Sequence, residues 1–364
     1  MSFLKNIFNK KDEAIKSYED FWSWFQKNEK EFYTVIKQKN NIEQNFFNKL
    51  SPKLNELKEG IFYLTGMVNQ DTVELILTPD GIIKNIVFVE ELIKSAPEIN
   101  HWLFTALKPP AEIKNIQINM AGHSFSKDNM HFCFKQDNNF PDEIDITIIH
   151  NDYNEENKST ITNGIYIFLD NFLGELNFIT SIDNLKIAGK EGAEEQIIPI
   201  EKLKEFLNWR EKEFIEKYEG IRHNTDNDNY SILEAELQNG TALIAVVNTD
   251  LLEWDSKASH PWILSVEIKY SGENNNGMPD QPTSELLNEI ENKILENLRD
   301  LDGYLNVGRE TANSTREIYF ACKDFRKPSS VLHQIQLKYA NKIAINYDIY
   351  KDKYWKSFDR FINN

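Results

Sequence analysis

The chain has few cysteines, no long apolar run and a shortage of positive charge. Its 364 residues include only two cysteines, Cys133 and Cys322, and each lies in an apolar, strand-like stretch. A disulfide-stabilised secreted scaffold uses more cysteines at framework spacing, so two buried, reduced thiols are expected. No run approaches the ~20 apolar residues of a membrane helix. The first residues, MSFLKNIFNKKDE, also lack the apolar core of a secretory signal, and together these absences predict a cytoplasmic protein.

Positive charge is outnumbered by negative charge. The chain has 41 Lys and Arg against 58 Asp and Glu, a net charge of -17. A nucleic-acid-binding protein needs a basic surface to displace the counterions of phosphate, and an anionic membrane repels an acidic protein. The composition therefore predicts no nucleic acid and no membrane partner, and another protein is the expected partner. The hydrophobic content of 40% is enough to build folded cores.

The signatures of common enzymes and metal sites are also missing. The sequence contains no Walker loop, no GxSxG elbow and no HExxH helix motif. His131 and Cys133 form a His-x-Cys pair with His123 upstream, but a zinc site needs a fourth ligand and tighter spacing. We therefore expect no catalytic residue, no metal and no cofactor. A non-enzymatic regulatory or protein-interaction protein is the leading functional hypothesis.

Two domains of the α+β class are expected, since domains commonly hold ~100–200 residues. Apolar residues recur at helical spacing over residues 14–39 and 46–57, and strand-like and helical stretches then follow one another. A charged helix ends at Gly220, and the polar stretch IRHNTDNDN after it is typical of a linker. We predict an N-terminal α+β domain over residues 1–200, a connecting helix and linker over 201–228, and a C-terminal domain over 229–364.

The C-terminal domain shows the clearer pattern. From Trp262 onward, the order β-α-β-β-α-β is typical of the ferredoxin-like, split βαβ arrangement. QNGT between two strand-like runs predicts an extra hairpin before this unit, and the amphipathic stretch around Trp355 predicts a helix after it. Its best-defined helix is expected over residues 284–300, with Thr283 as N-cap. The N-terminal domain is expected to follow a similar plan after two leading helices.

The stretch VGRETANSTREIYFAC, residues 307–322, predicts a β-hairpin with one arginine on each strand. If the loop is Ala312-Asn313, Arg309 lies directly opposite Arg316, and both point to the rim of the helix-covered face. Like charges in direct opposition destabilise a sheet, so negative charge must lie close to the two arginines.

Two interpretations of this arginine pair remain open. In the ferredoxin-like arrangement, the loop after the first strand lies near the hairpin turn, and its Glu273 and Asp280 are the expected neighbours of the arginines. The cluster is then either a set of structural salt bridges or a site for an outside anion or carboxylate. The second interpretation makes a small-anion-binding or carboxylate-binding protein, or an enzyme that uses an arginine-lined rim, the alternative function.

Four motifs resemble those of an uncharacterised bacterial family, domain-of-unknown-function family number 695. The motifs are NNGMPDQ, VGRET, REIYF and YWKSF, and the resemblance covers roughly residues 230–361. Two departures are Asn276, where the family has aspartate, and a hairpin turn without glycine. A more distant likeness, of fold alone, is to the small acidic proteins that inhibit ribonuclease E.

The resemblance implies a fold but no activity, because the function of the family is unknown. The residues that stand at the family's motif positions are Gly277, Pro279, Val307, Gly308, Arg309, Arg316, Tyr319, Phe320 and Trp355. The candidate binding residues are Arg309, Arg316, Glu273, Asp280 and Tyr319.

Overall fold

The structure, a computed structural model, describes residues 14–193 and 195–362. The chain divides into two compact units, Met1–Pro109 and Pro110–Asn364. This division differs from the predicted boundary at residues 201–228. One reason is that the strands of residues 1–200 form separate sheets rather than one. A second is that Asp183 forms an ion pair with Lys353, which ties the middle of the chain to the C-terminal part.

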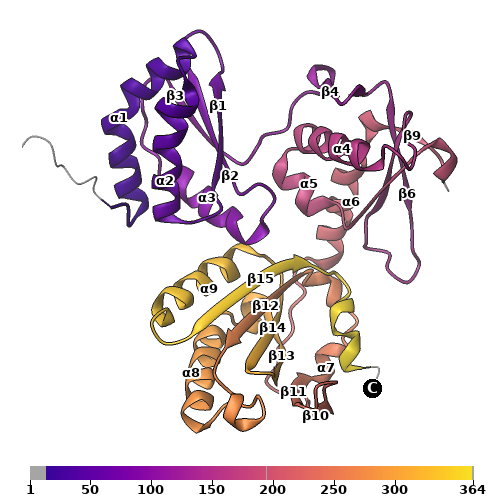
Figure 1. The fold of residues 1–364 in the computed structure, drawn as a ribbon. Coiled ribbons are helices and arrows are strands. Elements are labelled where there is room, and N and C mark those ends of the chain that lie inside the picture. The colour runs from indigo at the N-terminus through magenta and orange to yellow at the C-terminus, as the bar shows by residue number, and fades with distance from the viewer. Residues whose placement is uncertain (1–13, 194, 363–364) are drawn as a thin grey trace, which may run out of the picture. The chain divides into compact units, whose positions relative to one another are not determined.

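The first unit is an α+β arrangement around a three-stranded sheet of order β1-β2-β3 (Figure 1). Its aromatic helix begins after Ser17, whose side chain accepts a hydrogen bond from the Asp20 N–H, four residues later than predicted. Phe25 of this helix packs edge-to-face on Trp102 and Phe104, so the apolar residues predicted at helical spacing form part of the core. The elements are α1 (Tyr18–Gln38), η1 (Glu43–Phe47), α2 (Asn48–Leu57), β1 (Phe62–Met67), β2 (Val73–Thr78), α3 (Ile86–Lys94) and β3 (Trp102–Ala106).

The first half of the second unit contains a four-stranded sheet of order β8-β7-β6-β9. Helix α4 buries Ile161, Ile165 and Phe168 in the core of this half. A Cβ at Gly164 would lie 2.1 Å from the Phe125 ring, so the close packing of this helix requires glycine. The elements are β4 (Ile118–Met120), β5 (His123–Phe125), β6 (Met130–Lys135), β7 (Asp145–His150), α4 (Lys158–Leu173), α5 (Glu175–Ser181), β8 (Asn184–Ala188), β9 (Ile198–Pro199) and α6 (Leu203–Tyr218).

The second half of this unit contains a six-stranded antiparallel sheet of order β10-β11-β13-β14-β12-β15. The predicted extra hairpin is β10-β11. Helices α8 and α9 pack together, and α9 contacts β15. The elements are β10 (Tyr230–Glu236), β11 (Ala242–Asn248), α7 (Thr249–Leu252), β12 (Trp262–Lys269), α8 (Gln281–Asn297), β13 (Tyr304–Ala312), β14 (Thr315–Cys322), α9 (Arg326–Tyr339), β15 (Ala344–Lys351) and η9 (Lys356–Phe361).

Two helix boundaries in this sheet domain differ from the prediction. Helix α8 begins at Gln281, because the Asp280 carboxylate, and not Thr283, caps it by accepting the Thr283 N–H. Pro282 fits in the first turn, where no backbone donor is needed. The helix predicted around Trp355 is the 3₁₀ helix η9. Trp355 directly precedes it and has left-handed backbone angles. Helix η9 packs Phe358 against Tyr319 on the sheet face opposite α8.

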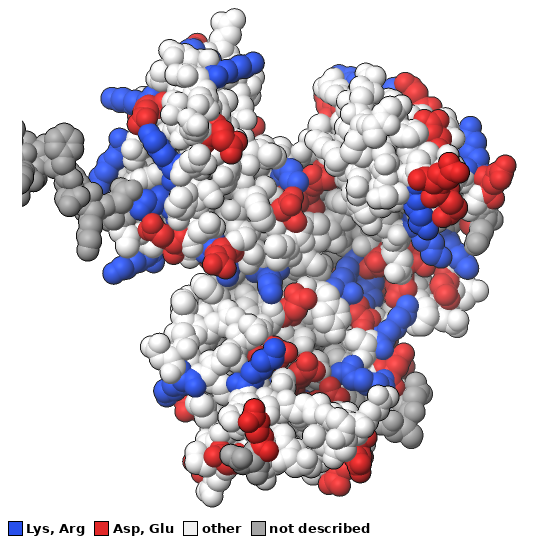
Figure 2. Space-filling model, viewed as in Figure 1, with Lys and Arg blue, Asp and Glu red and all other residues white. Residues whose placement is uncertain are grey.

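Both cysteines are buried free thiols, as predicted, and burial raises the pKa of Cys322. Within the described ranges, no helix is long and apolar enough to cross a membrane. Lys and Arg side chains are interspersed with Asp and Glu on the visible face rather than gathered in one patch (Figure 2).

Candidate functional site

The arginine hairpin forms, but its register differs from the predicted one. The turn is Asn313-Ser314, where both residues have positive φ, so Ala312 pairs with Thr315 and Thr311 pairs with Arg316. Arg309 lies opposite Ile318 instead of Arg316. The prediction was wrong because this turn has no glycine to mark it. The shift still keeps both arginines on one face, since partners directly across a ladder share a face.

The negative charge beside the arginines comes from helix α8. Arg309 Nη1 donates to both oxygens of Glu291, at 2.8 and 2.7 Å. Arg316 Nη1 lies 3.6 Å from the same carboxylate and donates to Asn288 Oδ1 at 2.8 Å. Burial and the charge of Arg309 lower the pKa of Arg316. We call Arg309, Glu291 and Arg316 the arginine triad, in which two cations share one carboxylate from the same chain.

The predicted loop reaches the hairpin turn but does not supply this carboxylate. Gly277 O accepts the Ser314 N–H at 2.8 Å, so the loop lies on the turn as expected. Glu273 is exposed within that loop, and Asp280 caps α8. The ion-pair partner of Arg309 is therefore Glu291, and neither loop residue takes that place.

Tyr319, the fifth predicted residue, lies on the other face of the sheet. Its hydroxyl lies 2.8 Å from Glu310 Oε2 and also contacts Glu317, and its ring packs against Phe358. Arg360 forms an ion pair with Glu310 at 2.9 Å. Tyr319 is separated from the arginines because it is an odd number of residues from Arg316 along the same strand.

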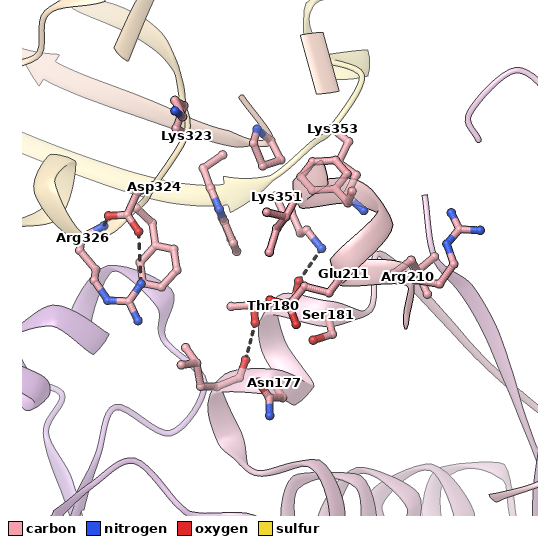
Figure 3. A pocket seen from close by; sticks show the side chains of 17 residues that line it. Asn177, Thr180, Ser181, Arg210, Glu211, Lys323, Asp324, Arg326, Lys351 and Lys353 are labelled. Carbon is pink, nitrogen blue, oxygen red and sulfur yellow. Dashed lines mark hydrogen bonds and ion pairs between the residues drawn. The ribbon is translucent and has the colours of Figure 1, made fainter. Parts of the chain in front are cut away.

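A second cluster of cations, which sequence reasoning missed, lines a hollow of about 300 Å³ within the second unit (Figure 3). We call it the cationic pocket. Trp262, Phe325 and Phe214 supply apolar wall, and the acidic residues that line it are Glu211 and Asp324. Its five basic residues are Arg210, Lys323, Arg326, Lys351 and Lys353.

Two lysines of the pocket share one buried carboxylate. Lys351 Nζ lies 2.7 Å from Asp183 Oδ1, and Lys353 Nζ lies 2.7 Å from Asp183 Oδ2. Lys351 also donates to Thr180 O at 2.5 Å, and Lys353 donates to Asp142 O at 2.6 Å. The Asp183 side chain is only 8% exposed. We call Lys351, Asp183 and Lys353 the lysine triad, which carries a formal net charge of +1.

The opposite side of the pocket carries Lys323, which follows β14, and Arg326, the first residue of α9 (Figure 3). Arg326 lies over the Phe325 ring and pairs with Asp324 at 3.2 Å. Burial and the charge of Arg222 lower the pKa of Lys323. In the described part of the chain, no carboxylate lies within ion-pair distance of Lys323.

The sequence carries a weak signal for this pocket. KDFRKP at residues 323–328 and YKDKYWK at residues 350–356 concentrate basic residues after strands in an otherwise acidic chain. Only the fold brings these two stretches together with α5 and α6. Among residues 14–193 and 195–362, no group of three or more His, Cys, Asp or Glu could hold a metal ion.

Comparison with protein families confirms the resemblance deduced from the motifs. Residues 228–362 match the model of a family described as "Family of unknown function (DUF695)". The matched region contains the arginine triad and four of the five cations of the pocket, all except Arg210. No curated protein and no solved structure matched the chain.

Proposed function

We propose that this protein binds a small amphiphilic anion, an anionic group attached to an apolar body, in the cationic pocket. The observation that carries the proposal is Lys323, which lines a concave hollow together with Trp262 and Phe325 and has no ion-pair partner among the described residues. Binding sites for small molecules are usually hollows of roughly 300–1,000 Å³ with apolar walls and a few polar groups that fix orientation. Charge-assisted hydrogen bonds to an anion are stronger than neutral ones.

This proposal follows the alternative function predicted from the sequence but moves it to another site. At the arginine triad, Glu291 already occupies the position that an outside anion would take. In the cationic pocket, Lys323 has no such internal partner among the described residues. A regulatory or protein-interaction role for the whole chain remains a prediction, and a protein that responds to a bound anion is compatible with it.

We also infer that residues 262–351 have the ferredoxin-like, split βαβ arrangement. The strand order β15-β12-β14-β13 and the antiparallel pairing of each neighbouring pair support this inference. Helices α8 and α9 make the two crossovers of the unit. In this arrangement, α9 begins at the end of β14, which places Lys323 and Arg326 at the pocket.

Titration calorimetry with octanoate tests the proposed function. At pH 7 the protein should bind one octanoate, and the neutral analogue octan-1-ol should bind at least ~10-fold more weakly, because a charge-assisted bond contributes about 1.5–3 kcal/mol. Lys323→Met should weaken octanoate binding by a similar factor. Lys327→Met is the control, because Lys327 lies four residues further along, in the first turn of α9, and pairs with Asp302 outside the pocket. Equal losses in both variants, or no octanoate binding, would contradict the proposal.

A further inference from the structure

Lys353 is the most buried cation of the cationic pocket. Its side chain is 4% exposed, against 14% for Lys351 and 35% for Arg326. Its ammonium donates to Asp183 Oδ2 at 2.7 Å and to Asp142 O at 2.6 Å, which leaves one N–H without an acceptor among the described residues. Lys351 donates to Thr180 O and forms an ion pair with Asp183. Each ammonium of the lysine triad therefore retains at least one donor for an incoming group.

We infer that Lys353 is a proton switch for this pocket, and that a monoanionic carboxylate is the group that the lysine triad receives. The inference rests on the proposed function, because it assigns the chemistry and the control of the same site. When Lys353 is protonated, the triad has a charge of +1 and matches one carboxylate. When Lys353 is neutral, Asp183 balances Lys351 alone and the triad no longer attracts an anion.

The surroundings of Lys353 explain why its proton can be lost near neutral pH. Burial lowers the pKa of Lys353 to about 8, with a further contribution from the Lys351 charge, against the attraction of Asp183 and Asp142. The Phe214 ring of α6 covers the ammonium at 4.8 Å and offers no full negative charge. The Asp142 carboxylate is itself engaged by Lys217, Tyr218 and Tyr354.

The other charges of the pocket are close to balanced, which makes the lysine triad decisive. Arg326 pairs with Asp324 at 3.2 Å, and Arg210 lies 4.0 Å from Glu213. Lys323 and Glu211 both line the pocket with opposite formal charges, although they form no ion pair with each other. The +1 charge that remains belongs to the lysine triad and depends on the Lys353 proton. A carboxylate bound there would stabilise that proton, so binding and protonation favour each other.

Octanoate is the probe for this inference, because its carboxylate does not titrate between pH 7 and pH 9. Its dissociation constant in the full-length protein should rise about 10-fold from pH 7 to pH 9, because the pKa of Lys353 is about 8. Calorimetry at pH 8 in two buffers of different ionisation enthalpy should detect the uptake of about half a proton per octanoate bound. Lys353→Arg keeps the charge at all these pH values and should remove both effects.

A second variant tests the inference independently in case Lys353→Arg folds poorly. Lys351→Gln removes the like charge that lowers the pKa of Lys353, so the midpoint of the pH dependence should move above 8 even though affinity falls. Loss of the pH dependence in Lys353→Arg and a raised midpoint in Lys351→Gln would each support the switch. Octanoate binding that is equally tight at pH 7 and pH 9, with no proton uptake, would overturn the inference and leave the proposed function standing. Absence of octanoate binding at pH 7 in the wild-type protein would overturn both.

Discussion

The arginine triad and the lysine triad have the same charge pattern in two different settings. In each, two cations share one carboxylate: Glu291 between Arg309 and Arg316, and Asp183 between Lys351 and Lys353. The members of the arginine triad lie within 26 residues of chain, on one hairpin and the helix beside it, since Glu291 is 18 residues from Arg309. Asp183 and Lys353 are 170 residues apart.

The difference shows that charge pattern alone does not identify a binding site. The arginines use their planar, permanently charged groups on internal acceptors, namely Glu291 and Asn288. The lysines line a hollow with an apolar wall, and the charge of Lys353 depends on pH because burial can remove a proton from lysine but not from arginine. We therefore interpret the arginine triad as structural and the lysine triad as functional.

The largest expected effect is on stability when the carboxylate of the lysine triad is removed. Asp183→Asn leaves two lysines without a counter-ion, and breaking such a buried pair costs about 3–5 kcal/mol. The Asp183 side chain is 8% exposed and that of Lys353 is 4% exposed, so water cannot replace the lost charge. Urea unfolding should show this loss. Asp324→Asn, at a pair whose carboxylate is 42% exposed, is the control and should cost less than about 1 kcal/mol; equal losses would refute the distinction.

The second effect is a rise in the free energy of unfolding at alkaline pH. Of the two triads, only the lysine triad should contribute to it. The pKa of Lys353 is about 8 in the folded protein against 10.5 as its ordinary value. Between these values the unfolded chain holds a proton that the folded chain has lost, so raising the pH favours folding. The stability of the wild type relative to Lys353→Met should rise by up to about 3 kcal/mol from pH 8 to pH 10.5. The corresponding difference for Arg316→Met should stay constant, and a rise there as well would argue against the assignment.

A smaller effect is expected at the carboxylate of the arginine triad. Glu291→Gln should lower the free energy of unfolding by about 2 kcal/mol, because Arg316 is buried but Arg309 is one-third exposed and remains hydrated. Thermal unfolding measures this loss. If inorganic phosphate then stabilises the variant far more than the wild type, an anion can enter the vacated position. If phosphate stabilises the wild type equally well, the triad binds anions already and is not purely structural.

The smallest effect is expected for a change that keeps charge but alters geometry. Arg309→Lys should cost less than about 1 kcal/mol, because this side chain is one-third exposed and its pairing with Glu291 is only partly shielded from water. Chemical unfolding should measure this loss of stability. The control is Arg299→Lys, because Arg299 is 66% exposed and pairs with Asp302 on the surface. A loss above about 2 kcal/mol would mean that bidentate geometry, rather than charge, holds the hairpin against α8.

The sequence predicted well what depends on neighbours along the chain. The α+β class, the β10-β11 hairpin, the arginine hairpin and the family resemblance were all deduced correctly. Errors appeared where the local signal was weak. The Asn313-Ser314 turn has no glycine, so the hairpin turn was predicted one residue too early. The start of α8 was predicted too late because proline inside a helix usually interrupts it, whereas Pro282 lies in the first turn, where proline is favourable. Alternation along β14 predicts that Tyr319 points away from Arg316, and applying it strictly would have removed Tyr319 from the candidate site.

The cationic pocket could not be deduced from the sequence, because its chemistry depends on contacts between distant segments. Nothing in KDFRKP or YKDKYWK indicates that Lys351 and Lys353 meet Asp183, or that Phe214 covers Lys353. The compact units also depend on such contacts, which is why the predicted linker at residues 221–228 is not where the chain divides.

The long separation between Asp183 and Lys353 also has a consequence for biosynthesis. The ribosome adds roughly 5–20 residues per second, so Asp183 emerges about ten to thirty seconds before the lysine 170 residues later that neutralises it. During that interval Asp183 lacks both of its lysine partners, so its carboxylate must stay hydrated while the β8-β7-β6-β9 sheet forms. The contact of Lys353 with the Phe214 ring of α6 also has to wait until the last strand has been made.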